Sequence, residues 1–275
     1  EFWLNLQAQY EVDIKNIAIR DEKEREAFNI ERMLTNIINL PELYRRLCIN
    51  SSLFIQDKLD KLEELMGFPV LNLSTQPFIL QRCFKKNEKH ETDERNETTW
   101  LTLAYIKSRN IKPEKQYING NAQKAAEEIS KSAHLGGITE NDIQLVLNKY
   151  GIAYSVIPKL EKTPIDAASL QMSGYPSIIT THRYNDMSRL IFNILHELGH
   201  IQKHMSFEND NQCSVFVSSE NDYSRDNKEE REANEFAEDM LIPKETWKKM
   251  MSTSTKNLSN QYILRTLKQL SSEYS

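Results

Sequence analysis

The sequence has little cysteine, no excess of positive charge and no long apolar run. Its 3 Cys residues are an odd number at no ligand-like spacing, which argues against a disulfide framework and favours a reducing compartment. The net charge of −5 at pH 7 does not indicate a nucleic-acid-binding protein. No run is long enough to span a membrane, and no signal-peptide pattern opens the chain. These absences predict a cytoplasmic protein without a membrane partner.

The composition is typical of a helix-rich protein. The chain has 275 residues, room for one large or two modest domains, with 39% hydrophobic and 27% charged residues. We divide it into three regions, 1–12, 13–115 and 116–275. The second shows helical periodicity over much of its length and no catalytic constellation, so we expect a spacer or docking domain there.

A pentapeptide H-E-L-G-H begins at His196, inside a segment whose apolar residues recur at helical spacing. We expect one helix over residues 187–205. Side chains four apart on a helix lie on one face, so His196 and His200 can reach the same tetrahedral metal ion. Glu197 then leans over the open metal position and can take a proton from water there. The alternative is a pair of surface histidines, but the chain has only 6 His and the intervening Glu must match too.

A third protein ligand is needed if one metal position is to stay open for water. The candidate is Glu230, in an amphipathic helix predicted over 229–243. Asn234 lies one turn further along the same face, where it can accept a hydrogen bond from a ligating histidine and fix its tautomer. The alternative is that the Glu residues of this helix form only a solvated acidic face.

Together these motifs resemble the ImmA/IrrE metallo-endopeptidases. The resemblance rests on H-E-L-G-H-x-x-x-H followed by E-x-x-A-N-x-F-A-x-x-x-L-x-P, and it covers residues 138–247. It implies that His196, His200 and Glu230 bind Zn²⁺ and that Glu197 is the catalytic base. Glu232 is a competing ligand, but Glu230 has the first position of E-x-x-A-N. The final Met-Pro of the family is Ile-Pro here, outside the site.

Three further residues are weaker candidates for the site. His204 lies one turn past His200, at a position where the family often has His, and a surface role is the alternative. His182, near the end of a predicted strand, can polarise a substrate carbonyl or be structural. Tyr223, in a long polar segment over 205–227, can approach the oxyanion.

The predicted fold class is α+β, a zincin-like metallopeptidase core preceded by a helical domain. Helices are expected over 121–135 and 140–150, and Thr139 should cap the second. Strands are expected over 152–157, 167–172 and 177–181, and a further one over 214–217. Short strand pieces are expected between 70 and 80. After Pro243, terminal helices are expected over 246–251 and 258–274.

The first residues, EFWLNLQAQYE, are helical in pattern and place two large aromatics at the end of the chain. They resemble the last helix of the helix-turn-helix domain of HigA-type antitoxin regulators. The resemblance implies that a DNA-binding domain precedes Glu1 in a longer protein, and that DNA is contacted only through that domain.

Two functions are therefore predicted. The first is a zinc-dependent endopeptidase that cleaves a regulatory protein, a repressor or an antitoxin, within a transcription-regulation or toxin–antitoxin system. The alternative is a non-catalytic DNA-binding antitoxin or regulator whose peptidase-like domain senses or docks a partner. The sequence makes no prediction of the oligomeric state.

Overall fold

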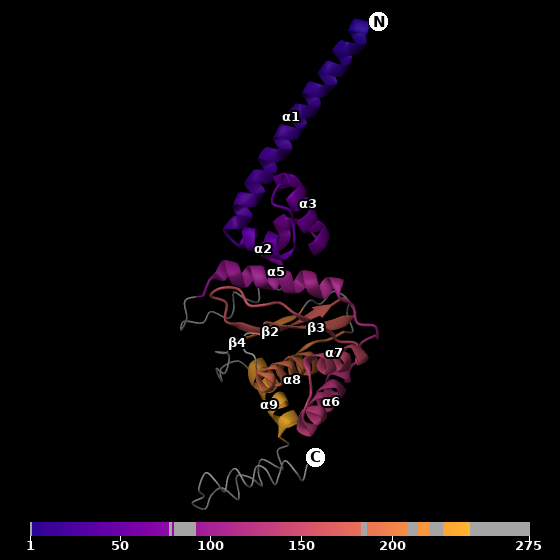
Figure 1. The fold of residues 1–275 in the computed structure, drawn as a ribbon, viewed down its shortest axis with the longest axis vertical. Coiled ribbons are helices and arrows are strands. Elements are labelled where there is room, and N and C mark those ends of the chain that lie inside the picture. Colours follow the sequence, from indigo (N-terminus) through magenta and orange to yellow (C-terminus); the bar gives the residue numbers. More distant parts are fainter. Residues whose placement is uncertain are drawn as a thin grey trace, which may run out of the picture. The chain divides into compact units, whose positions relative to one another are not determined.

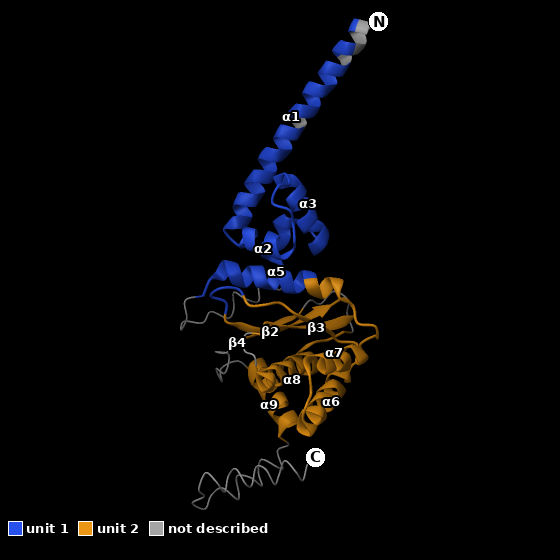
Figure 2. Cartoon of the chain, in the orientation of Figure 1, with its two compact units in different colours: residues 1–83, 91–106, 160–163 blue, residues 84–90, 107–159, 164–275 orange. Residues whose placement is uncertain are grey.

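The computed structural model describes residues 2–76, 79, 92–182, 186–207, 214–219 and 228–242. These residues form helices and one four-stranded sheet, so the predicted α+β class is confirmed (Figure 1). The chain divides into two compact units, shown in Figure 2. Unit 1 holds residues 1–83, 91–106 and 160–163, and unit 2 holds residues 84–90, 107–159 and 164–275. The predicted regions 13–115 and 116–275 were contiguous, whereas these units interleave along the sequence.

Unit 1 is helical. It contains α1 (Phe2–Thr35), α2 (Leu40–Arg46), α3 (Ile55–Met66), the 3₁₀ helix η1 (Val70–Thr75) and the larger part of α5 (Glu94–Asn110). Its core includes the buried side chains Leu34, Ile38, Leu43, Leu62, Leu73 and Trp100. Short strand pieces were predicted between residues 70 and 80. This prediction is wrong for Val70–Thr75, which form the 3₁₀ helix η1. Val70 and Leu73 are both buried at a spacing of three, which a 3₁₀ helix places on one side.

Helix α1 crosses residue 12 without a break, so no structural boundary separates the predicted region 1–12 from the region after it. Trp3 and Tyr10 are exposed along this helix. The resemblance of this segment to a helix-turn-helix domain stays a prediction.

Unit 2 is built on a mixed sheet with the strand order β1-β3-β2-β4. Strand β1 (Ala153–Val156) is parallel to β3 (Tyr175–Thr180), and β2 (Ile165–Met172) is antiparallel to both β3 and β4 (Val215–Ser219). The turn between β2 and β3 contains Gly174 at φ +84°, a conformation that glycine adopts without strain. The four predicted strands are present, although β2 and β3 each begin two residues earlier than predicted.

In the described part of unit 2 the sheet is accompanied by the end of α5 and by α6 (Asn121–Leu135), α7 (Glu140–Lys149), α8 (Met187–His204) and α9 (Lys228–Leu241). Thr139 caps α7 as predicted, in a capping box with Asp142. Helix α8 contacts β2, β3, α6 and α9, and thus lies between the sheet and the outer helices (Figure 1). The predicted terminal helices lie outside the described residues. Among the described helices, none is long and apolar enough to cross a membrane.

Candidate metal centre

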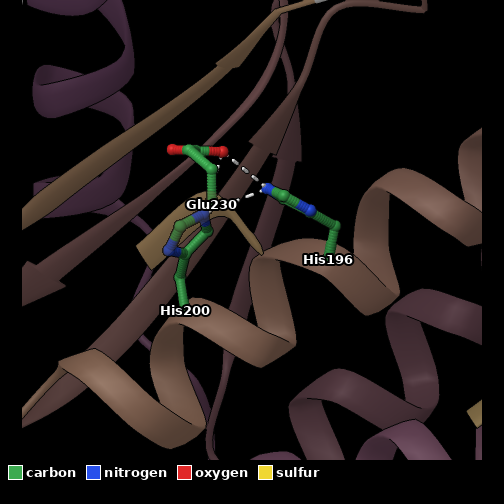
Figure 3. A group of neighbouring side chains, drawn as sticks. All are labelled: His196, His200 and Glu230. Carbon is green, nitrogen blue, oxygen red and sulfur yellow. Dashed lines mark hydrogen bonds and ion pairs between the residues drawn. The ribbon is translucent and has the colours of Figure 1, made fainter. Parts of the chain in front are cut away.

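Two imidazoles and one carboxylate converge inside unit 2 (Figure 3). Nε2 of His196 lies 3.0 Å from Nε2 of His200, and Oε2 of Glu230 lies 3.2 Å and 3.6 Å from these two nitrogens. All three side chains are buried, and one ligand atom from each lies within 4.8 Å of the others. The structure thus brings together the three predicted ligands, from α8 and α9, in a group that could hold one metal ion.

The two helices can approach closely because small residues face each other between them. Helix α8 places Gly199 against α9, where Ala233 is fully buried. Phe236 and Ala237 continue the buried side of α9, and Leu195 and Leu198 are buried on α8. Burial of these apolar side chains holds the helices together and sets the carboxylate beside the imidazoles.

Asn234 contacts the far side of the first imidazole. Its Oδ1 lies 2.8 Å from Nδ1 of His196, as the spacing from Glu230 predicted. An amide oxygen only accepts, so Nδ1 of His196 must carry the proton and Nε2 must carry the lone pair. Asn234 therefore selects the tautomer in which His196 can bind a cation through Nε2.

Glu197 is fully buried beside the cluster. Ser218 of β4 donates a hydrogen bond of 2.5 Å to Oε1 of this carboxylate. Burial raises the pKa of Glu197, and this effect outweighs the opposing influence of His196 and Ser218. A buried glutamate with a raised pKa next to a metal site is suited to both accepting and releasing a proton.

The weaker candidates have different outcomes. His204 contacts the cluster: its Nδ1 lies 3.1 Å from Nδ1 of His200, and its Nε2 lies 3.0 Å from Oε2 of Glu232. The competing ligand Glu232 thus points to His204, and it is not in the metal-binding group of the described residues. The hydrogen bond from His204 is the main reason that the pKa of Glu232 is lowered.

His182 has a positive φ of 51° just after β3, and its Nε2 lies 2.8 Å from Oε1 of Glu140 at the start of α7. Tyr154 donates to the same carboxylate oxygen. These contacts indicate a structural role for His182, which links the end of β3 to the start of α7. Tyr223 lies outside the described residues, so its predicted role is not placed.

Ser218 and Phe216, both on β4, were missed by the sequence reasoning. The ring of Phe216 stacks on His200, with centroids 4.4 Å apart and planes 14° from parallel. A strand was predicted over 214–217, but nothing in its sequence indicates which helix it faces. These contacts cannot be predicted from the local sequence, because α8 and β4 come together only in the folded protein.

The donor set fits a divalent metal. Asn234 already fixes the proton of His196 on Nδ1, so a lone pair on Nε2 of His196 points at Nε2 of His200 from 3.0 Å. Two lone pairs that face each other at this distance repel, and a cation bound to both nitrogens removes that repulsion. Two imidazoles and one carboxylate are the protein ligands of many catalytic zinc sites, which keep a fourth position for water.

With Glu197 beside them, these groups define a metallopeptidase-like site. Residues 156–274 match the family model of the IrrE N-terminal-like domain, Peptidase_M78. The match includes all three metal-binding candidates and supports a peptidase domain of the ImmA/IrrE type in this part of the chain. Comparisons with curated proteins and with solved structures give no match.

Proposed function

We propose that unit 2 is a zinc-dependent endopeptidase with a zincin-like core. The observation that carries the proposal is the approach of Glu230 to both imidazoles, with the buried carboxylate of Glu197 directly adjacent to His196 in the sequence. Each of these four side chains has a distinct chemical task, and the family match over residues 156–274 supports their use in peptide hydrolysis.

His196, His200 and Glu230 are the residues that would hold the metal. Zinc bound there would lower the pKa of a water molecule and polarise the scissile carbonyl. The histidines offer Nε2 and the glutamate offers Oε2, which are the atoms that already face one another. Zinc is preferred to manganese or iron because it favours this nitrogen-rich set of few ligands.

Glu197 acts as general base and then as general acid. It takes a proton from the attacking water and passes it to the amine that leaves when the peptide bond breaks. The hydrogen bond from Ser218 to Oε1 orients this carboxylate. Burial raises the pKa of Glu197 and makes it a stronger base than an exposed glutamate.

The substrate that we propose is a regulatory protein in the cytoplasm, either a repressor or an antitoxin. This part of the proposal rests on the resemblance of the motifs to ImmA/IrrE enzymes. The alternative is a regulator without activity, which the HigA-like first residues favour. A purely structural metal site has no use for a buried carboxylate such as Glu197, and this favours the enzyme.

The test is metal analysis of the purified full chain, followed by incubation with candidate repressors and antitoxins with and without a chelator. Glu197→Gln should abolish cleavage while zinc still binds, because the amide cannot accept the proton from water. Glu235→Gln, an exposed position on α9, is the matched control and should cleave normally. Undiminished proteolysis by Glu197→Gln would refute the assigned base.

A further inference from the structure

A second chain of contacts leads from the metal centre to the surface of α9. It starts at Nδ1 of His200, continues through His204 and ends at the carboxylate of Glu232. His204 comes from the last turn of α8, and its side chain is largely buried. Neither His204 nor Glu232 belongs to the group that could hold the metal.

The hydrogen atoms in this chain of contacts can be arranged in only one way that leaves His200 able to bind a cation. Binding through Nε2 requires the lone pair on Nε2, so the proton of His200 must be on Nδ1. The 3.1 Å contact between the two Nδ1 atoms then makes Nδ1 of His204 the acceptor.

The proton of His204 is accordingly on Nε2, where the carboxylate of Glu232 accepts it at 3.0 Å. If Glu232 did not draw the proton to Nε2, His204 could carry it on Nδ1 and donate it to His200. His200 would then hold its own proton on Nε2, between itself and the other two ligands.

Neighbouring side chains fix the positions of these groups. Phe216 stacks on the ring of His200 and also contacts His204, with centroids 5.5 Å apart. Lys203 donates to the backbone carbonyl of Glu232, and Lys228 lies 3.6 Å from the carboxylate. The two lysines favour the ionised form of Glu232, which is the form that accepts a hydrogen bond most strongly.

We propose that His204 and Glu232 are positioning residues that hold His200 in the Nδ1–H tautomer, with Nε2 facing His196 and Glu230. This inference rests on the proposed metal-dependent function. Asn234 accepts the hydrogen bond from Nδ1 of His196, and His204, held by Glu232, accepts the one from Nδ1 of His200. Each imidazole of the centre therefore has its own acceptor for the Nδ1 proton.

The first experiment measures zinc affinity by competition with a chromophoric chelator, and needs no substrate. His204→Leu removes the acceptor and should lower the affinity about 10–100-fold, the usual effect of losing an outer hydrogen-bond partner. His204→Asn keeps an oxygen near the position of Nδ1 and should restore much of it. Glu232→Gln should weaken binding less than His204→Leu, and Glu235→Gln should not change it.

The second experiment reads the tautomer directly. Long-range ¹H–¹⁵N NMR spectra of histidine side chains distinguish the two neutral tautomers, and they can be recorded on the metal-free full chain. We expect Nδ1–H for His200 in the natural sequence, and a shift of population towards Nε2–H in His204→Leu. Equal thermal unfolding of the variants and the natural chain would show that the fold is kept.

The proposal is overturned if His200 is Nε2–H in the natural sequence, or if folded His204→Leu binds zinc as tightly as the natural chain. Failure of the proposed function has a different signature. In that case the tautomer and affinity results hold, but the zinc-loaded chain cleaves no repressor or antitoxin. If the natural chain binds no zinc, the affinity comparison cannot be made, and the tautomer of His200 alone decides whether the proposed positioning role holds.

Discussion

Gly199 of α8 lies directly against the backbone of Ala233 in α9. A Cβ atom at Gly199 would be 3.1 Å from both the Cα and the carbonyl oxygen of Ala233, and 3.2 Å from the Cβ of Phe236. The glycine of H-E-L-G-H therefore sets the distance between the helix that carries two ligand candidates and the helix that carries the third. These three atoms belong to the backbone or are bonded directly to it, so they cannot rotate away from an added Cβ as the end of a flexible side chain could.

Gly199→Ala should loosen the metal centre. Alanine favours the helix by about 1 kcal/mol over glycine, but overpacking against fixed atoms costs about 1–3 kcal/mol. We expect a net loss of unfolding free energy of about 1 kcal/mol, measured by urea denaturation with a chelator present. Zinc affinity should fall about tenfold because Glu230 moves away from the imidazoles. Greater stability with unchanged zinc affinity would contradict this account of the close contact.

Ser218→Ala should slow the proposed peptidase without weakening zinc binding. The hydroxyl donates to the carboxylate of Glu197, and hydrogen bonds to charged groups contribute about 1.5–3 kcal/mol. Because the contact orients the base, kcat should drop about 10–100-fold with little change in KM. Ser218→Thr keeps the hydroxyl and serves as the control. If the alanine and threonine variants lose activity equally, orientation of Glu197 is not the reason.

Zinc affinity should fall on acidification while the pH is still above 6.5. Burial alone would lower the pKa of His196, but the hydrogen bond to Glu230 and the charges of Glu197 and Glu230 outweigh it and raise this pKa above its ordinary 6.5. Protons and zinc compete for Nε2, so a raised pKa moves the loss of affinity to higher pH. Chelator competition across the range from about pH 8 to about pH 5.5 measures it. Affinity that declines only below 6.5 would count against the raised pKa.

The metal-free chain should show the opposite pH dependence in its stability. The pKa values of His196 and Glu197 are both raised by folding, so each contributes stability at low pH that is lost as pH rises through its folded-state value. Denaturation with a chelator, repeated across the same range, should therefore show a decrease in unfolding free energy with rising pH. Because the metal-free chain should be more stable at lower pH, this measurement checks that the fall in zinc affinity on acidification is not caused by unfolding.

Local periodicity predicted much of the scaffold of the site. The apolar spacing around His196 predicted a helix over 187–205, and α8 spans Met187–His204. The spacing of Glu230 and Asn234 predicted that they share one face of a helix, and the structure places both beside His196. These predictions succeeded because they depend on positions four apart on one helix, which the sequence encodes directly. The catalytic and ligand roles stay predictions.

Contacts between distant segments could not be predicted in the same way. Nothing near Ser218 indicates that it faces Glu197, since strand β4 meets α8 only after the sheet has formed. The pairing of Glu232 with His204 was likewise hidden, because five glutamates of the same helix look alike in sequence.

The centre joins His196 to Glu230 across 34 residues of sequence. A cation held there would close that stretch into a loop, and β4 with Ser218 lies within it. Closing a loop reduces the freedom of the unfolded chain, and a ligand that binds only the folded form shifts the balance further. Metal supply would then set the stability of the folded chain as well as any activity of the site, so starvation for the ion would lower the folded fraction of the protein.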